Sequence, residues 1–199
     1  MSLETIVQPY TMATPERVLL LIDLARRVVE TNIPGDMVEC GVSNGGSAAI
    51  LAHFATHSGK KTWLFDSFEG MPPTTEEDGH AASLCIGQCV GTIDTVKKVL
   101  ELVHADMSRV EIVKGWFQDT FPTVFIPQIA MLNLDSDWYE SEKLCLNKFY
   151  DNVSPGGFVY FDDFFYWRGC RQAAEKFFVA RAIAPKFNQV GHSMWIQKA

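Results

Sequence analysis

The stretch Met37-Val-Glu-Cys-Gly-Val-Ser-Asn-Gly-Gly-Ser47 decides the fold of this chain. An apolar run, Met37–Val42, predicts a buried strand, and Gly45–His57 after the glycine-rich turn predicts a helix. This order is typical of the first unit of a parallel sheet that is buried on both faces. The glycines allow the backbone to approach a ligand, and Glu39 suits a cationic or hydrogen-donating ligand group better than a pyrophosphate. The plainer interpretation is a tight strand-to-helix turn that binds nothing.

The rest of the chain repeats this alternation of strands and helices. The expected strands are Thr62–Phe68, Arg109–Lys114, Ile129–Asp135 and Gly157–Asp163. The expected helices are Arg17–Glu30, which starts at Thr14-Pro15-Glu16, then Thr92–His104, Tyr139–Val153 and Gly169–Ala182. Phe187–Val190 and Ser193–Gln197 predict a C-terminal antiparallel hairpin. The order predicts an α/β, Rossmann-like fold with a mostly parallel central sheet flanked by helices.

Length and composition predict one domain over residues 1–199. The chain has 47% hydrophobic and 21% charged residues, which is ordinary for a globular protein. We expect residues 1–33 to form an N-terminal helical segment. Residues 69–91, rich in Gly, Pro, Thr and acids, are expected to form a lid loop.

Charge and targeting signals exclude several classes of protein. A net charge of −7 disfavours nucleic acid and anionic membranes as partners. No apolar run is long enough to span a membrane, and Met1–Tyr10 does not resemble a signal peptide, so we expect a cytoplasmic protein. The five cysteines form no CxxC pair, which favours free thiols over a zinc site; a loop disulfide is the alternative.

Carboxylates follow four of the predicted strands, in the sequences Glu39-Cys-Gly, Asp66-Ser67, Asp135-Ser136-Asp137 and Asp162-Asp163. Acids at the ends of buried strands are unfavourable unless they are solvated, paired, or bound to a cation or to hydroxyl groups. In a parallel sheet these ends meet at one edge, where such folds bind their ligands. The sequence therefore predicts an acidic ligand-binding crevice.

Asp66 lies at the end of the second expected strand, at a position where an acid can accept both hydroxyls of a ribose. A turn or helix-capping role is the plainer alternative. Together with the glycine-rich turn, this acid predicts a nucleoside-containing cofactor. NAD and S-adenosylmethionine both fit this pattern.

Asp135, Asp162 and Asp163 distinguish between these cofactors. If their strands are neighbours, the three carboxylates repel one another unless a cation lies among them. An all-oxygen set favours Mg²⁺, which could hold a substrate hydroxyl and lower its pKa. That chemistry suits methyl transfer to oxygen and has no obvious use in hydride transfer. The alternative is that Asp162-Asp163 simply begins a loop.

These residues resemble the macrocin O-methyltransferase family over nearly the whole chain. The matching segments are Pro9-Tyr-Thr-Met12, Gly35-Asp-Met-Val-Glu-Cys-Gly-Val42, Ser43-Asn-Gly-Gly-Ser47, Trp63-Leu-Phe-Asp-Ser-Phe-Glu-Gly-Met-Pro72, Lys114-Gly-Trp-Phe-Gln-Asp-Thr120, Leu134-Asp-Ser-Asp-Trp-Tyr-Glu-Ser141, Ser154-Pro-Gly-Gly-Phe158, and Asp162-Asp163 with Gly169-Cys170-Arg171. The resemblance implies a class I methyltransferase that depends on S-adenosylmethionine and Mg²⁺. It implies a sugar or phenolic hydroxyl of a natural product as acceptor, and a homo-oligomer of two or more copies.

The resemblance also implies roles for individual residues. The metal ligands would be Asp135, Asp162 and Asp163. The cofactor-binding residues would be Thr11, Met12, Glu39, Gly41 and Ser47 at the methionine end, Asp66 at the ribose, and Trp116 and Phe117 around the adenine with Gln118 nearby. Gly45, Ser67 and Asp135 would also bind the cofactor. Residues 73–91 match the family poorly, and Ser136 stands where the family has glycine.

The base that takes the proton of the acceptor remains open. The candidates are Asp135, Asp137 and, in the lid, His80. Asp137 could instead be the N-cap of the helix that starts at Tyr139, or a partner of a metal ligand. His80 could equally be an ordinary surface histidine.

Two rival functions also remain open. A nicotinamide-dependent oxidoreductase would bind NAD and need no metal. A non-catalytic protein of the same fold would bind S-adenosylmethionine without transferring its methyl group.

Overall fold

The central sheet runs through the whole molecule. The computed structural model describes residues 1–199 and has one seven-stranded sheet in the order β3-β2-β1-β4-β5-β7-β6. The strands are β1 (Asp36–Cys40), β2 (Thr62–Asp66), β3 (Val110–Lys114), β4 (Ile129–Leu134), β5 (Val153–Phe161), β6 (Asn188–Val190) and β7 (Ser193–Gln197). The first five are parallel, while β7 is antiparallel to β5 and to β6. The predicted fold and terminal hairpin are confirmed.

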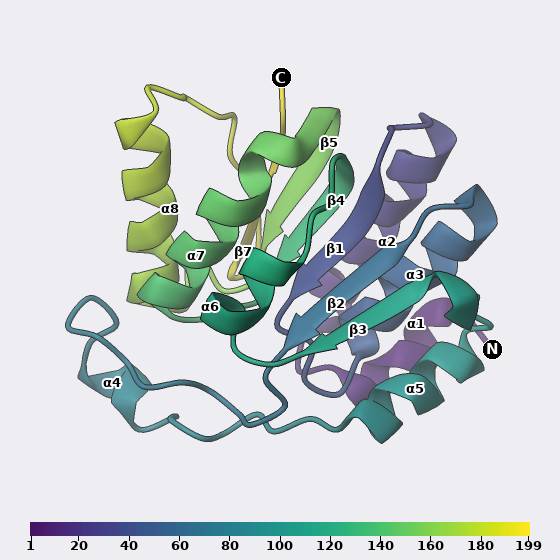
Figure 1. Ribbon diagram of the computed structural model, residues 1–199, viewed down its shortest axis with the longest axis horizontal. Helices are drawn as coiled ribbons and strands as arrows, with labels where there is room; N and C mark the ends of the chain where they lie inside the picture. The colour runs from purple at the N-terminus through teal and green to yellow at the C-terminus, as the bar shows by residue number, and fades with distance from the viewer.

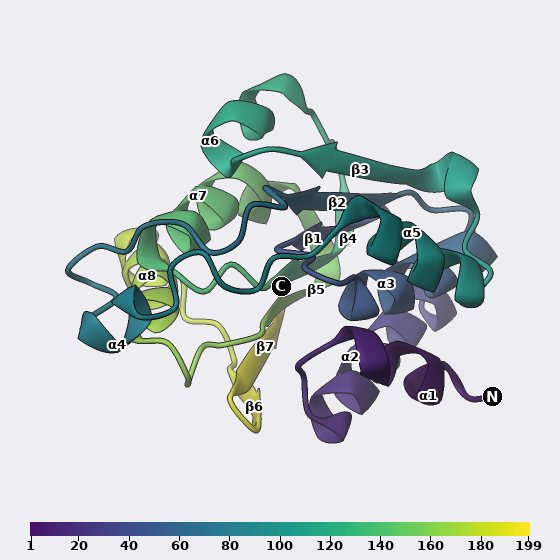
Figure 2. The ribbon, with the colours of Figure 1, turned by 90° about the horizontal axis from the view of Figure 1, so that it is seen from below.

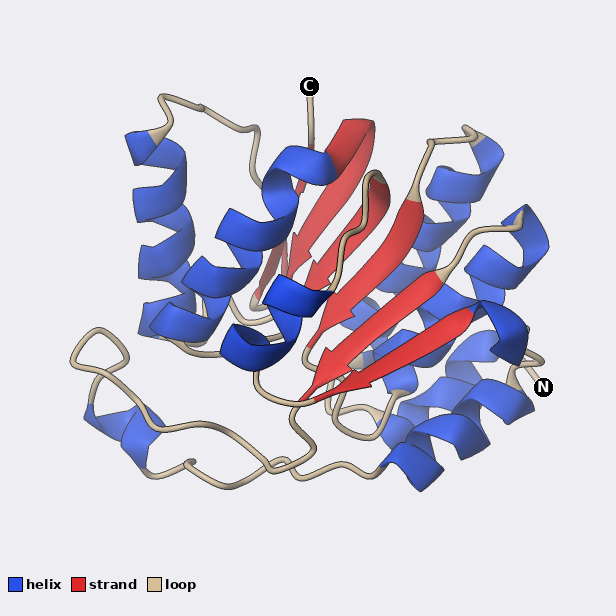
Figure 3. Cartoon of the chain, viewed as in Figure 1, coloured by secondary structure: helices blue, strands red, loops and turns tan.

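Helices cover both faces of the sheet (Figures 2 and 3). The α-helices are α1 (Leu3–Val7), α2 (Pro15–Glu30), α3 (Gly46–Ser58), α4 (His80–Ser83), α5 (Ile93–Leu102), α6 (Phe117–Thr120), α7 (Tyr139–Phe149) and α8 (Arg168–Ala180). Four short 3₁₀ helices extend or connect them: Gln8–Tyr10, Met107–Arg109, Phe121–Thr123 and Tyr150–Asn152. Helices α1, α2, α3 and α5 pack on one face, and α7 and α8 on the other, so the sheet separates two apolar cores. None of the helices combines the length and apolar character needed to cross a membrane.

Local sequence signals account for several helix boundaries. Thr14 is the extended N-cap residue of α2 and Pro15 occupies its first turn, where a missing N–H is harmless. Gly59 ends α3 in the left-handed conformation, with its N–H bonded to the carbonyl of Ala55. These are the signals that made the two helices predictable.

The prediction was wrong around the start of β5. We expected the Tyr139 helix to continue to Val153 and Ser154-Pro155-Gly156 to form a turn, but α7 ends at Phe149 and β5 starts at Val153. Ile129 pairs with Val153 whereas Met131 pairs with Phe158, so the register of β5 against β4 shifts here. Pro155 has no N–H to donate to the ladder, and a bulge is where a strand tolerates proline.

The strand order places the site. It reverses between β1 and β4, and a crevice forms at the carboxyl ends of parallel strands at such a point. In Figure 1 the strands β1, β2 and β3 end toward the long segment 69–91 that carries α4. The acids predicted at the strand ends therefore lie along one edge of the sheet.

We predict that Phe149→Ala lowers the free energy of unfolding by about 3–5 kcal/mol, measured by urea denaturation. Phe149 is fully buried, and its ring centroid lies 4.9 Å from that of Phe121 and 5.4 Å from that of Phe65. Phe125 is 79% exposed, so the control Phe125→Ala should change stability by less than about 0.5 kcal/mol. Equal effects of the two substitutions would contradict the assignment of this core.

Candidate functional site

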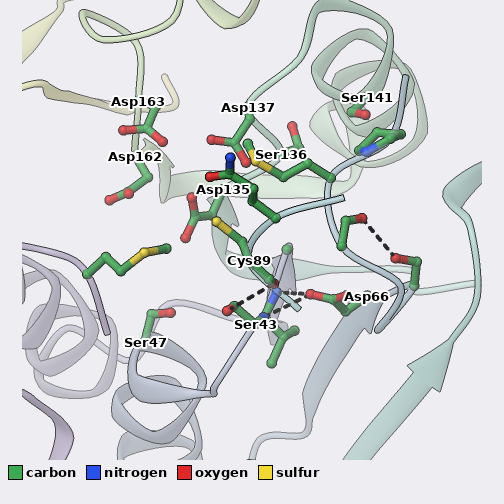
Figure 4. Close-up of a pocket in the computed structure, with 18 of the residues that line it drawn as sticks. Ser43, Ser47, Asp66, Cys89, Asp135, Ser136, Asp137, Ser141, Asp162 and Asp163 are labelled. Atoms are coloured by element: carbon green, nitrogen blue, oxygen red, sulfur yellow. Dashed lines mark hydrogen bonds between the residues drawn. The ribbon is translucent and has the colours of Figure 1, made fainter. Parts of the chain in front are cut away.

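A cavity of about 800 Å³ opens at the carboxyl ends of the parallel strands. It is lined by the N-terminal segment before α2, the glycine-rich turn after β1, the segment 69–91, and the loops that follow β2, β3, β4 and β5. Figure 4 shows the four aspartates of the β4 and β5 ends on one side of this cavity, with Ser43 and Asp66 on another. The site is thus assembled from segments that are distant in the sequence.

Backbone hydrogen bonds hold the acids at the strand ends. The sheet ladder continues one residue beyond β4 and β5, since the N–H of Asp135 bonds to the carbonyl of Cys40 and that of Asp162 to the carbonyl of Leu134. Asp135 and Asp162 therefore leave adjacent strands at the same level. The sequence prediction that these carboxylates meet at one edge is confirmed.

Three of the acids form a close group. One carboxylate oxygen each from Asp135, Asp137 and Asp163 lies within 4.8 Å of the others. Burial raises the pKa of Asp135 well above its ordinary value, and the charges of the neighbouring aspartates raise it further. The pKa values of Asp137 and Asp163 are raised for the same two reasons. Such a group gains stability from a cation or from retained protons.

Asp162 lines the same cavity but is not a member of this close group. Its carboxylate pairs with the buried guanidinium of Arg17 on α2 and accepts a hydrogen bond from the Tyr160 hydroxyl at 2.9 Å. Arg17 also lies 3.5 Å from Asp163. The close group thus contains Asp137 in place of Asp162, which the sequence suggested as the third metal ligand.

Asp137 does not cap α7. The N-cap residue of that helix is Trp138, and the first N–H of the helix, on Tyr139, bonds instead to Asp78 Oδ1 at 2.7 Å. Asp137 adopts the left-handed conformation, with φ of 59°, which is uncommon outside glycine. The capping alternative for Asp137 is therefore wrong, and its carboxylate faces Asp163.

Glu39 is fully buried behind the cavity and is not one of its lining residues. Its Oε1 accepts a 2.7 Å hydrogen bond from Asn133 on β4, while Oε2 has no partner. Burial raises its pKa to about 8, although the hydrogen bond from Asn133 and the nearby Ser47 hydroxyl oppose the shift. An unpartnered buried oxygen beside Ser47 suits a ligand group that donates a hydrogen bond.

Asp66 lines the cavity and also closes the glycine-rich turn. Its Oδ2 accepts the N–H groups of Val42 and Ser43 at 2.7 and 2.8 Å, and Oδ1 accepts the N–H of Phe68 at 2.6 Å. A carboxylate offers about four acceptor positions, so one remains for a ligand hydroxyl. The structure therefore leaves room for one hydroxyl contact at Asp66, whereas the sequence suggested two.

Most of the predicted cofactor-binding residues line the cavity: Thr11, Met12, Gly41, Ser47, Asp66, Ser67, Trp116, Phe117, Gln118 and Asp135. Gly45 does not, because it sits at the start of α3 against Val96 on α5. His80, the candidate base in the lid, is exposed and is also absent from the cavity wall. Gly41 has φ of 91°, and an added Cβ would lie 1.9 Å from the Asp135 carbonyl oxygen, so glycine is required where β1 passes β4.

Sequence reasoning missed Arg17, Asp78, Asn133 and Glu142. Only Arg17 carried a usable signal, because it is a charge next to Val18 on the apolar face of α2. Glu142 is fully buried and bonds to Ser136, the residue that departs from the family pattern, at 2.5 Å. Burial raises the pKa of Glu142 to about 8. All five cysteines are free thiols, with Cys85 and Cys89 in the cavity wall.

Comparison with known proteins identifies the family. The sequence model of the macrocin O-methyltransferases (TylF) matches residues 4–198. The chain belongs to the macrocin O-methyltransferase family. It is therefore an O-methyltransferase that depends on S-adenosylmethionine.

Relatives of named activity support the assignment of the chain to this family. Demethyldecarbamoylnovobiocin O-methyltransferase of Streptomyces niveus is 31% identical over 184 residues, which are 84% of this chain and 67% of the relative. A second relative is the 8-demethyl-8-(2,3-dimethoxy-alpha-L-rhamnosyl)-tetracenomycin-C 4'-O-methyltransferase of Streptomyces olivaceus. It is 35% identical over 169 residues, which are 78% of this chain and 62% of the relative. This chain thus spans about two thirds of the length of these relatives. The solved structure of the O-methyltransferase NovP has a TM-score of 0.85 and 27% identity, and covers 96% of this chain and 82% of its own.

We predict that Glu142→Gln reduces the pH dependence of stability between pH 5 and 7.5. Because the folded pKa of about 8 lies above the ordinary value of 4.5, the folded state holds a proton that the unfolded chain releases in this range. The free energy of unfolding therefore falls as pH rises, by up to about 1.4 kcal/mol per pH unit for one such group. Glutamine still accepts the Ser136 hydrogen bond but has no proton to lose.

Urea denaturation at several pH values, with chelator present, measures this slope. Glu140→Gln is the matched control, since Glu140 lies on the same helix but is exposed and paired with Lys143. The control should keep the slope of the parent protein. An unchanged slope in Glu142→Gln would show that Glu142 is ionised in the folded state.

Proposed function

We propose that this chain transfers the methyl group of S-adenosylmethionine to a hydroxyl of a sugar or phenolic natural product, with Mg²⁺ at the aspartate group. Both relatives named above are O-methyltransferases, and the substrate of the Streptomyces olivaceus enzyme carries a rhamnosyl sugar. The proposal depends above all on one observation, the close group formed by Asp135, Asp137 and Asp163.

The residues of this group fit a hard divalent cation. All the donors are carboxylate oxygens, and Arg17 pairs mainly with Asp162. The pKa values of the three acids are raised first by burial and then by the charges of the neighbouring aspartates. Mg²⁺ prefers such oxygen ligands and keeps positions for water or substrate. Asp135 and Asp163 would hold it, with Asp162 or Asp137 as the third ligand. The ion, when bound, would lower the pKa of the acceptor hydroxyl.

The cavity also fits the cofactor. Its size lies within the range of small-molecule sites. Glu39, Ser47 and the Thr11-Met12 segment would hold the methionine end, with the unpartnered Glu39 Oε2 accepting from the amino group. Asp66 would accept one ribose hydroxyl, and Trp116 and Phe117 would flank the adenine. S-adenosylmethionine supplies the methyl group and leaves as S-adenosylhomocysteine.

The protein's own contribution is positioning and proton transfer. The wall residues exclude water and hold the acceptor oxygen in line with the methyl group, which accounts for most of the acceleration in such reactions. Asp135 or Asp137 would take the proton of the acceptor hydroxyl. His80 would need to move from its exposed position to do so.

Cytoplasmic location and a homo-oligomeric state remain predictions from the sequence. Gel filtration with light scattering would measure the number of copies in solution.

We predict that the folded protein binds S-adenosylmethionine in isothermal titration, and that its S-adenosylhomocysteine complex binds Mg²⁺. Asp135→Asn and Asp163→Asn should each weaken Mg²⁺ binding by about 10- to 100-fold while cofactor affinity changes less. Asp94→Asn, an exposed change on α5, is the control and should match the parent protein. Folded protein that binds no S-adenosylmethionine would refute the cofactor assignment.

We predict that Asp162→Asn and Asp137→Asn distinguish the third ligand. The variant that removes a ligand should lose Mg²⁺ affinity to the same degree as Asp163→Asn, and the other should lose less. If neither variant nor Asp163→Asn affects Mg²⁺ binding, the ion does not bind at this group. Cofactor binding without methyl transfer to any sugar or phenol tested would support the non-catalytic alternative.

A further inference from the structure

Asp78 connects the segment 69–91 to the start of helix α7. It lies just before α4 and is only 5% exposed. Its Oδ1 accepts the N–H of Tyr139, 61 residues further along the chain, at 2.7 Å. Its Oδ2 accepts the N–H and the hydroxyl of Thr75 at 2.7 and 3.0 Å. One buried carboxylate therefore ties the loop to the helix and also orders the loop itself.

The N-terminus of α7 depends on this distant carboxylate. The helix has no side-chain cap from its own N-cap residue, Trp138. A carboxylate at a helix N-terminus satisfies an unpaired N–H and interacts favourably with the helix dipole. Because Asp78 fills this role, the nearby Asp137 is left to face Asp163.

Further contacts hold the segment against α7 and α8. The indole N–H of Trp138 donates to the carbonyl of Pro72 at 2.9 Å, and its ring packs edge-on against Trp167. Arg168 donates to the carbonyls of Glu76 and Glu77 at 3.1 and 2.9 Å. These hydrogen bonds attach the part of the segment that precedes Asp78.

Gly169 leaves the space that Asp78 occupies. A Cβ added at Gly169 would lie 1.8 Å from Asp78 Oδ1 and 2.9 Å from the Tyr139 nitrogen. Only glycine allows α8 to pass this close to the Asp78–Tyr139 hydrogen bond.

The far side of the same segment forms one wall of the cavity. Its wall residues include Met71, Pro72, Pro73, Cys85, Gln88 and Cys89. Of these residues, Cys89 is labelled in Figure 4, where it lies between the aspartate group and Ser43, and the charges of Asp137 and Asp163 act on its thiol.

We propose that Asp78 is a positioning residue for methyl transfer. It fixes segment 69–91 as the wall of the acceptor side, and it holds the Ser136–Trp138 turn so that Asp137 faces Asp135 and Asp163. The second part of this inference rests on the proposed function.

Two measurements on Asp78→Ala test the inference. Hydrogen exchange should show that the Tyr139 amide and segment 69–91 lose roughly fivefold or more of their protection. Mn²⁺, used as a spin probe on the S-adenosylhomocysteine complex, should bind roughly fivefold or more weakly, while affinity for S-adenosylhomocysteine stays within about twofold. Asp78→Asn keeps one oxygen for the Tyr139 N–H but loses the acceptor for Thr75, so it should restore protection at Tyr139 and Mn²⁺ affinity more than protection within segment 69–91.

Asp106→Ala is the matched control. Asp106 accepts the N–H of Ser108 at the N-terminus of a 3₁₀ turn, away from the cavity. It should lose protection only near Ser108 and bind Mn²⁺ as the parent does. If Asp78→Ala does not fold, Gly169→Ala serves as the second variant, since it displaces the Asp78 carboxylate and should give the same pattern.

The outcomes separate the inference from the proposed function. Unchanged exchange at Tyr139 and in segment 69–91 would overturn the anchoring role. Lost protection with unchanged Mn²⁺ affinity would overturn the positioning role and leave Asp78 as a structural cap. Parent protein that binds neither S-adenosylhomocysteine nor Mn²⁺ would overturn the proposed function and the positioning role together, while the exchange data still decide the anchoring.

Discussion

Electrostatic repulsion among the aspartates at the ends of β4 and β5 constrains the rest of the site. Parallel pairing brings Asp135 and Asp162 to the same level, and the next residues add Asp137 and Asp163. In a buried crevice this repulsion is strong unless a cation, an arginine or retained protons reduce it. The guanidinium of Arg17 compensates the charge of Asp162. Burial, and then the charges of the neighbouring aspartates, still raise the pKa values of the other three acids. A divalent cation would compensate the charge of these three.

Close backbone approach at glycines makes the crevice possible. Gly41 lets β1 pass against the carbonyl of Asp135, and Gly91 lets segment 69–91 pass against the carbonyl of Ser43, 1.8 Å from where a Cβ would lie. Asp66 then closes the turn between these contacts by accepting two of its N–H groups. These three residues bring the cofactor side and the aspartate group to either side of one cavity.

The buried acids behind the cavity make the stability of the fold depend on pH. Glu39 and Glu142 are fully buried with pKa values near 8, each with one unpartnered oxygen. Both stabilise the fold most while they are protonated, so stability decreases toward alkaline pH. Glu39 lies next to Ser47, whereas Glu142 holds Ser136 between two aspartates. The two glutamates thus support opposite sides of the cavity.

The sequence by itself determined the alternation of strands and helices, the acids at the strand ends and the family. These features are local, because apolar runs, caps such as Thr14-Pro15 and motifs such as Ser43–Ser47 act over a few residues. Only the tertiary structure decided which acids group together and what each one contacts. Asp162 turns to Arg17, 145 residues earlier in the chain, and α7 is capped by Asp78, 61 residues away, which frees Asp137. No local pattern encodes such pairings, because the competition among carboxylates for donors and cations is settled only when the strand ends are packed together.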